Sequence, residues 1–428
     1  MMEGMPKALL EEMGEETFQL DSGLTVCVKE MPGYESVYAV YGTRFGSADR
    51  SFVLNGERID LPAGVAHFLE HKMFENEEGV DAFELYAKTG AMANAYTSFD
   101  KTCYVFGASE QVDESLDILL SFVSKPYFTA ETVHKEQGII GQEIKMYDDN
   151  PEWRMMFAMF DCLYHTCPVR DDIAGSVDSI AQITPEMLYK CTEAFYRPSN
   201  MVLAVAGGIT AKQVLAACER AGLEKKTARV ERLLAGEPEE IRRGEQTLFM
   251  SVSQPIVGLG YKETPFAAKE ERLKGEFICD ILTELIIGDT APLYRELYDK
   301  GLLNPGFSGE FLAGQGYLNF IFAGETREPQ AVVAAIKKEI ARLRREGVDE
   351  GRFLAIKNVL LGEAVTDLES TEAVATDMAS AYMLGRTRRE ELETLAALTK
   401  KDVEVGLAVM LCEERSAVVT ILPAKEKE

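Results

Sequence analysis

Residues 184–207 read T-P-E-M-L-Y-K-C-T-E-A-F-Y-R-P-S-N-M-V-L-A-V-A-G, and residues 399–422 read T-K-K-D-V-E-V-G-L-A-V-M-L-C-E-E-R-S-A-V-V-T-I-L. Each stretch begins with a threonine suited to a helix N-cap, continues with helical periodicity, breaks, and ends in an apolar strand-like run. The two threonines lie 215 positions apart, half of the 428-residue chain. Sequence identity between the stretches is low, so pattern and spacing alone predict two similar halves.

Strand-like and helical patterns are mixed within each half, which is typical of an α+β fold. The strand-like runs are Leu24–Val28, Val37–Tyr41, Thr102–Phe106, Met201–Val205 and Tyr317–Ala323. The helical runs are Pro62–Phe74, Val112–Val123, Ala130–Tyr147 and Gln330–Glu346. We therefore expect two homologous α/β-sandwich-like domains, each a mainly antiparallel sheet with helices on one face.

The domain boundary is expected in a charged stretch that contains glycine and proline around Gly236–Gly244. The sequence thus predicts an N-terminal domain over 1–235, a linker over 236–245 and a homologous C-terminal domain over 246–428. After the linker, Thr247–Gly260 is expected to resume as a strand.

The composition indicates a globular protein, with 46% hydrophobic and 27% charged residues. The net charge of -26 repels phosphate backbones, so we expect no nucleic-acid partner. That charge would favour a cationic partner or substrate, although an acidic surface also serves solubility alone. No run approaches the roughly 18 apolar residues of a membrane span. Five glutamates interrupt Met1–Phe18, which argues against a secretory signal and for a cytoplasmic protein.

The eight cysteines are scattered, which suits reduced thiols in a cytosol. Cys162 and Cys167 bracket His165 and could contribute to a metal site. Their spacing matches no common zinc finger, so we interpret them as buried structural cysteines beside a local histidine.

Residues 65–75 read V-A-H-F-L-E-H-K-M-F-E and follow the turn-like Asp60–Gly64. In a helix, His67 and His71 are four residues apart, so both imidazoles project from one face within reach of a single ion. Glu70 lies on the same side and is placed to take a proton from a water molecule. H-x-x-E-H is the inverzincin order, and it predicts a zinc site. With only four histidines in the chain, this spacing is an improbable accident.

A third ligand is expected from the helical segment that follows. Val133, Glu136, Ile140 and Glu143 form one continuous stripe, so two carboxylates occupy core-facing positions and need partners or a cation. The alternative is that this stripe faces water. His134 is the rival ligand, but it lies one position off the stripe and is expected at the surface.

Four segments resemble the pitrilysin/insulinase family of zinc metallopeptidases, which includes the mitochondrial processing peptidase. They are A-H-F-L-E-H-K-M-F-E (66–75), G-A-M-A-N-A-Y-T-S-F-D-K-T (90–102), K-E-Q-G-I-I-G-Q-E-I (135–144) and F-Y-R-P-S-N-M (195–201). The resemblance implies His67, His71 and Glu143 as zinc ligands. It also implies Glu70 as the catalytic base and Glu136 as a supporting catalytic carboxylate.

The resemblance further places Asn94 and Ala95 on a strand that pairs with the substrate backbone. A turn position is the alternative for Asn94.

The second half resembles the family only in outline. Active members carry an Arg and a Tyr that bind substrate near the zinc, whereas Tyr298 stands here at the Arg place and Asn304 or Pro305 at the Tyr place. Such a division resembles the short bacterial two-subunit members, and it implies a homologous sister subunit as partner, in a heterodimer or else a homodimer. The run I-I-G-Q-E-I-K-M-Y-D-D-N-P (139–151) resembles a group associated by name with aminopentanol modification of elongation factor P.

The sequence therefore predicts a zinc metalloendopeptidase that hydrolyses peptides or unfolded protein segments. A non-catalytic scaffold or processing-complex subunit of the same fold is the alternative, and the intact H-F-L-E-H and Glu143 argue against it. A transporter or metal-storage protein has no support, because one three-ligand site beside a base is arranged for chemistry.

Overall fold

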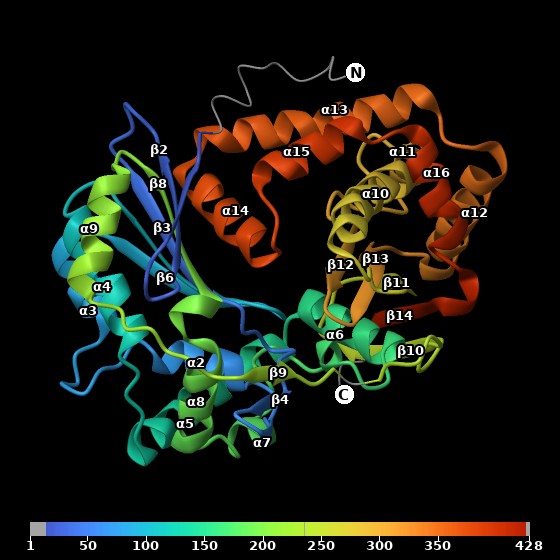
Figure 1. Cartoon of the computed structure of the whole chain (residues 1–428). Coiled ribbons are helices and arrows are strands. Elements are labelled where there is room, and N and C mark those ends of the chain that lie inside the picture. Colours follow the sequence, from blue (N-terminus) through green and yellow to red (C-terminus); the bar gives the residue numbers. More distant parts are fainter. Residues whose placement is uncertain (1–13, 235, 425–428) are drawn as a thin grey trace. The chain divides into compact units, whose positions relative to one another are not determined.

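The computed structural model describes residues 14–234 and 236–424. The described chain forms two compact units, and each draws on three separate stretches of sequence (Figure 1). The first unit lies within Met1–Ile144, Asp172–Leu233 and Glu363–Leu392; the second lies within Lys145–Asp171, Leu234–Gly362 and Glu393–Glu428. Part of Met1–Phe18, on which the expectation of a cytoplasmic protein rests, lies outside the described residues.

A six-stranded sheet with the order β1-β2-β8-β3-β7-β6 forms the centre of the first unit. Only β2 and β8 run parallel; the other neighbouring pairs are antiparallel. The strands are β1 (Glu16–Gln19), β2 (Thr25–Glu30), β3 (Val37–Thr43), β6 (Met92–Thr97), β7 (Thr102–Ala108) and β8 (Met201–Gly207). The predicted strand-like runs of the first half all lie in this sheet, within a residue or two at each end.

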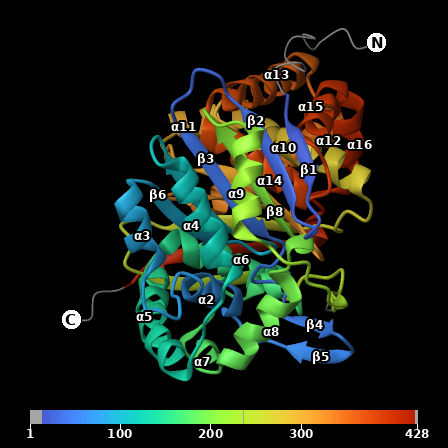
Figure 2. The ribbon, with the colours of Figure 1, turned by 60° about the vertical axis from the view of Figure 1, so that its left-hand side comes forward.

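Both faces of this sheet are buried. Alternate side chains of a strand point to opposite sides, so neighbouring residues join different cores. Val26 and Val28 of β2 join a large core that includes side chains of α4 (Val112–Ser124) and α9 (Ala211–Ala221). Figure 2 shows these two helices lying across that face. Cys27, between the two valines, points to the opposite face, where α14 (Thr371–Met383) provides the cover.

The second unit repeats this topology with a five-stranded sheet of order β10-β14-β11-β13-β12. The pair β10 and β14 is parallel, and the remaining pairs are antiparallel, as in the first sheet without β1. The strands are β10 (Glu245–Met250), β11 (Ile256–Lys262), β12 (Ser308–Gly314), β13 (Tyr317–Glu325) and β14 (Ser416–Pro423). The α+β class and the mainly antiparallel sheets are therefore confirmed.

The helix, break and strand predicted at 184–207 and 399–422 are present in both units. Thr184 caps α8 (Pro185–Phe195) by accepting a hydrogen bond from the Met187 amide, and β8 follows. Thr399 caps α16 (Lys400–Val409) in the same way, and β14 follows. Both strands take the second place in the matched order, between a parallel and an antiparallel neighbour.

Each sheet is also covered by one helix from the opposite half of the sequence, which the sequence alone did not predict. α6 (Pro151–Leu163) packs on β11 and β14 in the second unit. Gly258 and Gly260 of β11 make room for it, since a Cβ on Gly260 would lie 2.3 Å from the sulfur of Met159. Gly42 of β3 makes room for Met383 of α14 in the same manner.

The remaining helices lie on the large-core side of each sheet or in the connections. In the first unit they are α2 (Val65–Lys72), α3 (Ala82–Thr89), α5 (Ala130–Asp148, which runs into the second unit) and α7 (Val177–Ile180). In the second they are α10 (Lys269–Ile287), α11 (Pro292–Asp299), α12 (Pro329–Glu346), α13 (Glu350–Thr366) and α15 (Arg388–Ala397), the last two of which cross between the units. Among the described residues, every helix is too short or too polar to cross a membrane.

The single strand predicted over Thr247–Gly260 is wrong, because two strands occupy this stretch. β10 pairs parallel to β14 and β11 pairs antiparallel to it, so the chain must reverse its direction between them. Pro255, just before β11, lacks the amide that a continuous ladder would need.

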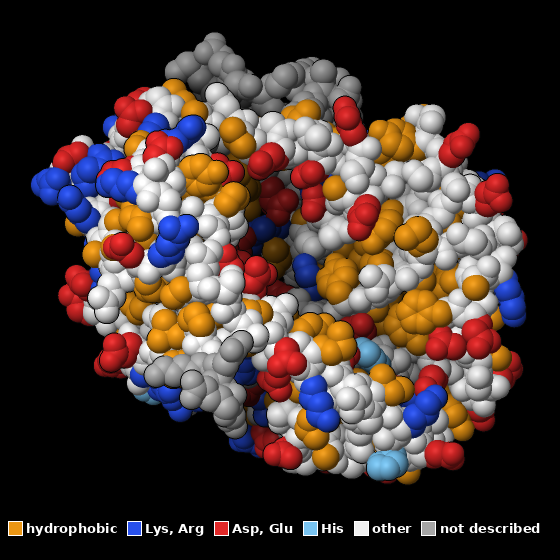
Figure 3. Space-filling model, turned by 180° about the vertical axis from the view of Figure 1, so that it is seen from behind, with side chains coloured by type: hydrophobic (Ala, Val, Ile, Leu, Met, Phe, Trp, Pro, Cys, Tyr) orange, Lys and Arg blue, Asp and Glu red, His pale blue; other side chains and the backbone are white. Residues whose placement is uncertain are grey.

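The predicted linker over 236–245 stays a prediction, but one of its residues is firmly bonded within the second unit. Glu237 accepts hydrogen bonds from the amides of His165 and Cys167, and it pairs with buried Lys262. Burial alone would raise the pKa of Glu237, yet these donors lower it to about 2. Acidic side chains are dispersed over the face drawn in Figure 3, as the net charge of -26 implies.

The helix that carries both histidines begins at a glycine no other residue can replace easily. Gly64 has φ +89°, and a Cβ there would lie 2.4 Å from the Ala174 carbonyl oxygen. Gly56 has a similar φ of +93° in the turn between β4 (Ser51–Leu54) and β5 (Glu57–Asp60), but a Cβ added there would meet no atom within 4 Å. A side chain at either position would strain the backbone, but only at Gly64 would it also clash with neighbouring atoms.

We expect Gly64→Ala to lower the free energy of unfolding by about 1–3 kcal/mol more than Gly56→Ala, because only the first substitution adds a clash to the left-handed backbone. Chemical denaturation of both variants measures the difference. Equal losses would show that the close approach at Gly64 does not constrain the start of α2.

Candidate metal centre

Helix α2 places two imidazoles side by side because its other face is held in the core. Val65, Phe68 and Leu69 are buried, so the helix cannot rotate about its axis without exposing them. The rings of His67 and His71 consequently share one face, with centroids 4.6 Å apart. This arrangement agrees with the spacing argument from the sequence.

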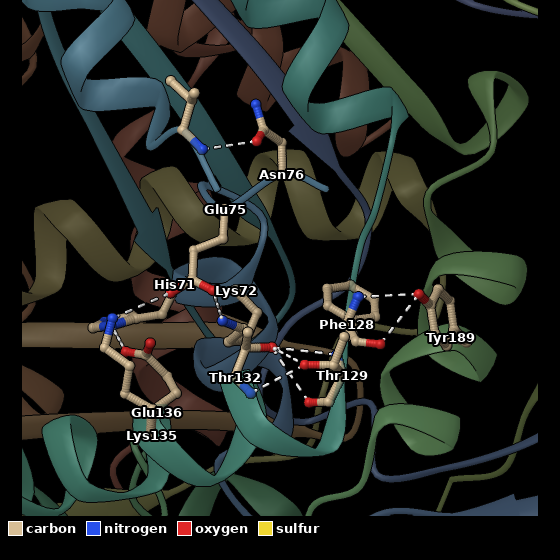
Figure 4. Close-up of polar contacts among 11 residues, drawn as sticks. His71, Lys72, Glu75, Asn76, Phe128, Thr129, Thr132, Lys135, Glu136 and Tyr189 are labelled. Atoms are coloured by element: carbon tan, nitrogen blue, oxygen red, sulfur yellow. Dashed lines mark hydrogen bonds and ion pairs between the residues drawn. The ribbon is translucent and has the colours of Figure 1, made fainter. Parts of the chain in front are cut away.

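Helix α5 supplies the facing carboxylates from the predicted stripe. Val133 and Ile140 are buried, as is the carboxylate-bearing Glu136, so the stripe faces the core and the water-facing alternative is wrong. Glu143, at the end of the stripe, is partly exposed. Thr129 caps the start of the helix by accepting a hydrogen bond from the Thr132 amide. The preceding Phe128 is tied to Tyr189, because its amide donates to the Tyr189 hydroxyl over 3.0 Å and its carbonyl accepts from that hydroxyl (Figure 4).

The side chains of His67, His71 and Glu143 converge on one point. His67 Nε2 lies 3.5 Å from Glu143 Oε1, and His71 Nε2 lies 3.5 Å from Glu143 Oε2. Zinc bonds of about 2.0–2.2 Å in a tetrahedron separate neighbouring ligand atoms by roughly 3.3–3.6 Å. Ligand atoms of the three residues lie within 4.8 Å of one another, and no other group of this kind occurs among the described residues. The donor set and its spacing fit a zinc ion.

Glu136 determines which nitrogen of His71 can bind a metal. Its Oε1 lies 3.1 Å from His71 Nδ1 (Figure 4), and an ionised carboxylate only accepts, so Nδ1 carries the proton. In the neutral ring, Nε2 then presents its lone pair toward Glu143. Two acceptors facing each other repel unless a cation or a proton lies between them.

A proton competes with the metal at His71. Burial lowers the pKa of His71, but the hydrogen bond to Glu136 and the charges of Glu70 and Glu143 outweigh it, so the net pKa is raised. Metal binding therefore displaces a proton from this ring when the pH is below that pKa. His67 differs, since its Nδ1 is buried and has no hydrogen-bond partner among the described residues.

Glu70 lies beside the three candidate ligands without belonging to their group. Its side chain is buried, and Thr97 at the end of β6 donates a hydrogen bond of 2.6 Å to its Oε2. Burial raises the pKa of Glu70, and the neighbouring Glu143 adds to the rise, against the opposing influence of His67. A carboxylate with a raised pKa is a stronger base, which suits proton abstraction near neutral pH.

Asn94 and Ala95 lie in β6, so the turn alternative for Asn94 is wrong. β6 is the edge strand of its sheet and pairs only with β7 among the described strands. Its outer edge thus offers backbone groups to a further strand. The Asn94 side chain accepts a hydrogen bond from the Ala95 amide.

Other candidates from the sequence lie elsewhere. His134 is exposed and contacts Gln137 at 3.3 Å, so it does not join the ligand group. Cys162 and Cys167 are buried free thiols in the second unit, and no described ligand group includes them. Tyr298 is exposed on α11 and stacks on Tyr294.

Thr97 and Lys72 are the contributors that sequence reasoning missed. Lys72 is fully buried directly after His71, and its ammonium pairs with Glu75 at the end of the helix (Figure 4). Glu75 in turn lies 4.0 Å from Lys135 of α5, so it links the two helices that carry the site. A lysine directly before the apolar pair Met73 and Phe74 was the only available signal, and nothing in the sequence joined Thr97 to Glu70.

Comparisons with known proteins agree with this architecture. The description "Insulinase (Peptidase family M16)" matches residues 52–177, and "Peptidase M16 inactive domain" matches residues 182–360. A Bacillus subtilis relative named "Uncharacterized zinc protease YmfH" is 37% identical over 98% of this chain and 100% of its own length. A second, "Uncharacterized zinc protease YmxG", also from Bacillus subtilis, is 25% identical over 86% of this chain and 91% of its own.

A solved structure of an M16-like peptidase from Alicyclobacillus acidocaldarius superposes with a TM-score of 0.93. It is 32% identical and covers 96% of this chain and 98% of its own. The repeated fold is that of the two-domain M16-like peptidases, and relatives of this chain are named zinc proteases. Within that class, the chain belongs to the insulinase (peptidase M16) family.

The ligand group predicts the metal content of variants. Wild-type protein dialysed against metal-free buffer should retain about one zinc per chain, and His71→Ala should lose it because His67 and Glu143 cannot complete the shell. His134→Ala, which removes an exposed histidine from α5, should retain the zinc. Mass spectrometry of the metal provides the measurement, and equal zinc content in His71→Ala and wild type would contradict the assignment.

Proposed function

We propose that this chain is a zinc metalloendopeptidase that hydrolyses peptides or unfolded protein segments, with Glu70 as the catalytic base. The observation that carries the proposal is the place of Glu70. It is buried next to the His67, His71 and Glu143 group, outside the ligand set, and held by Thr97. A carboxylate in that place is available for proton transfer.

The proposed reaction divides the work among the residues of the first unit. Zinc, when bound by His67, His71 and Glu143, would polarise the scissile carbonyl and lower the pKa of a water molecule. Thr97 donates to Oε2 of Glu70, so Oε1 would take the proton from the attacking water. The same carboxylate would later give that proton to the leaving amine. The hydrogen bond from Thr97 therefore fixes the orientation of the Glu70 carboxylate.

Glu136 is assigned a positioning role in this proposal. Its contact is with His71 Nδ1, and it is almost fully buried, which supports orienting the imidazole over touching a substrate. Asn94 and Ala95 are proposed to bind the substrate backbone through the open edge of β6, which gives affinity with little side-chain selection.

The roles of Glu70 are tested by Glu70→Gln. This variant should retain zinc while peptide hydrolysis falls by at least ~10²-fold, because an amide cannot accept the proton of the attacking water. Glu78→Gln, an exposed change of equal charge in the same unit, is the control and should leave hydrolysis unchanged. Full activity in Glu70→Gln, or loss of its zinc, would contradict the role given to this residue.

A homologous sister subunit is proposed as partner, because the second unit does not supply the family's Arg and Tyr. Tyr298 stands at the Arg place, and Asn304 or Pro305 at the Tyr place. Without these donors the developing oxyanion lacks part of its stabilisation. A homodimer would repeat the same deficit, so the heterodimer is favoured.

The isolated, zinc-loaded chain should therefore cleave peptides poorly. Adding a sister chain that has the Arg and Tyr but lacks H-x-x-E-H should raise kcat/KM by about 10²-fold or more, and mutating that Arg should reverse the gain. Full peptidase activity of the isolated chain would refute the need for a partner. If no assembly cleaves any peptide, the non-catalytic subunit becomes the better account.

A further inference from the structure

We propose that a pocket in the second unit binds a cationic side chain, the guanidinium of arginine or the ammonium of lysine, through Glu325. The pocket has a volume of about 630 Å³, which lies within the range of ligand sites. Residues of β11, β13 and the start of α6 contribute to its lining. Its polar lining is provided by Asn150, Glu152, Ser251, Ser253, Asn304 and Glu325.

The carboxylate of Glu325 is oriented and still lacks a cation. Gln254 Nε2 donates to its Oε2 over 2.6 Å, and Asn304 Nδ2 donates to the same oxygen. Neutral amides fix the direction of the carboxylate without cancelling its charge. Among the described residues, no basic side chain forms an ion pair with Glu325, and none of the residues that line the pocket is basic.

A cation fits this pocket better than an anion. The start of α6 would ordinarily attract an anion, but the Asn150 side chain already accepts hydrogen bonds from the amides of Glu152 and Trp153. Glu152 adds a second negative charge in the first turn. Both lining charges are therefore negative, which favours a positively charged ligand.

The apolar part of the lining matches the shape of a long basic side chain. Val252 and Ile256 form an aliphatic wall, and Gly306 and Gly324 present no side chains at all. Arginine and lysine bury their methylene stems against such surfaces while their charged ends seek an acceptor. The fork of a guanidinium in addition presents several N–H donors, which suits a lining that offers carboxylate and amide oxygens.

The proposal that this pocket binds a basic side chain rests on the proposed function in one respect, that the ligand is part of a polypeptide. The probes are twelve-residue peptides with one arginine moved through the sequence, each paired with its citrulline version, which is neutral and of nearly the same shape. Binding is measured by fluorescence anisotropy on the full-length, zinc-loaded Glu70→Gln protein, so that no peptide is cleaved.

We expect the arginine peptide to bind at least about tenfold more tightly than its citrulline version at one or more positions. Adding Glu325→Gln should abolish that preference, because glutamine still accepts from Asn304 and Gln254 but carries no charge. Adding Glu328→Gln, an exposed change of equal charge three residues away, should preserve it. Thermal unfolding of each protein verifies that the fold is kept.

Two results would overturn the pocket: equal binding of the paired peptides, or an arginine preference that survives Glu325→Gln. The proposed function fails separately. If wild-type protein hydrolyses no peptide either alone or together with a sister chain, while the preference persists and depends on Glu325, the pocket stands and the peptidase assignment falls.

Discussion

The concentration of negative charge around two imidazoles is the constraint on which the rest of the site depends. The pKa of His71 is raised by three carboxylates, those of Glu136, Glu70 and Glu143. Glu143 also raises the pKa of Glu70. Such a group is unstable in a partly buried place unless a cation or protons balance it. The fold maintains the group because both helices are constrained at their starts, α2 by a glycine and α5 by the Thr129 cap and the adjacent pairing of Phe128 with Tyr189. The charges are thus held ready for a metal ion.

The duplicated architecture allows one unit to carry the candidate metal ligands while the other is free to differ. Both sheets have the same strand order and the same single parallel pair, and each takes one helix from the opposite half of the chain. Because α6 packs on the second sheet and α14 on the first, one face of each sheet is covered by a helix from the other half of the sequence. Among the described residues, only the first unit has a His-His-Glu group. The second unit instead has a polar pocket with an uncompensated Glu325.

Sequence patterns predicted the local elements and the ligand stripe well, because both depend on short-range periodicity. His67 and His71 share a face since they are one helical turn apart, and the positions of Glu136 and Glu143 on one stripe of α5 follow from the apolar residues around them. Contacts between distant segments were not predictable in this way. The hydrogen bond from Thr97 to Glu70 joins an edge strand to a helix, and only the three-dimensional fold brings them together. The reversal before Pro255 was missed for the same reason, because it depends on which side of β14 each strand occupies.

Diffraction from crystals grown with zinc, recorded on both sides of the zinc absorption edge, locates the metal directly. One anomalous peak per chain should lie about 2.0–2.2 Å from His67 Nε2, His71 Nε2 and a Glu143 oxygen. Glu70 should stay outside the ligand shell with its hydrogen bond to Thr97 intact. A peak at another place in the chain, or a zinc ion bound directly by Glu70 in place of Glu143, would contradict the arrangement described for this site.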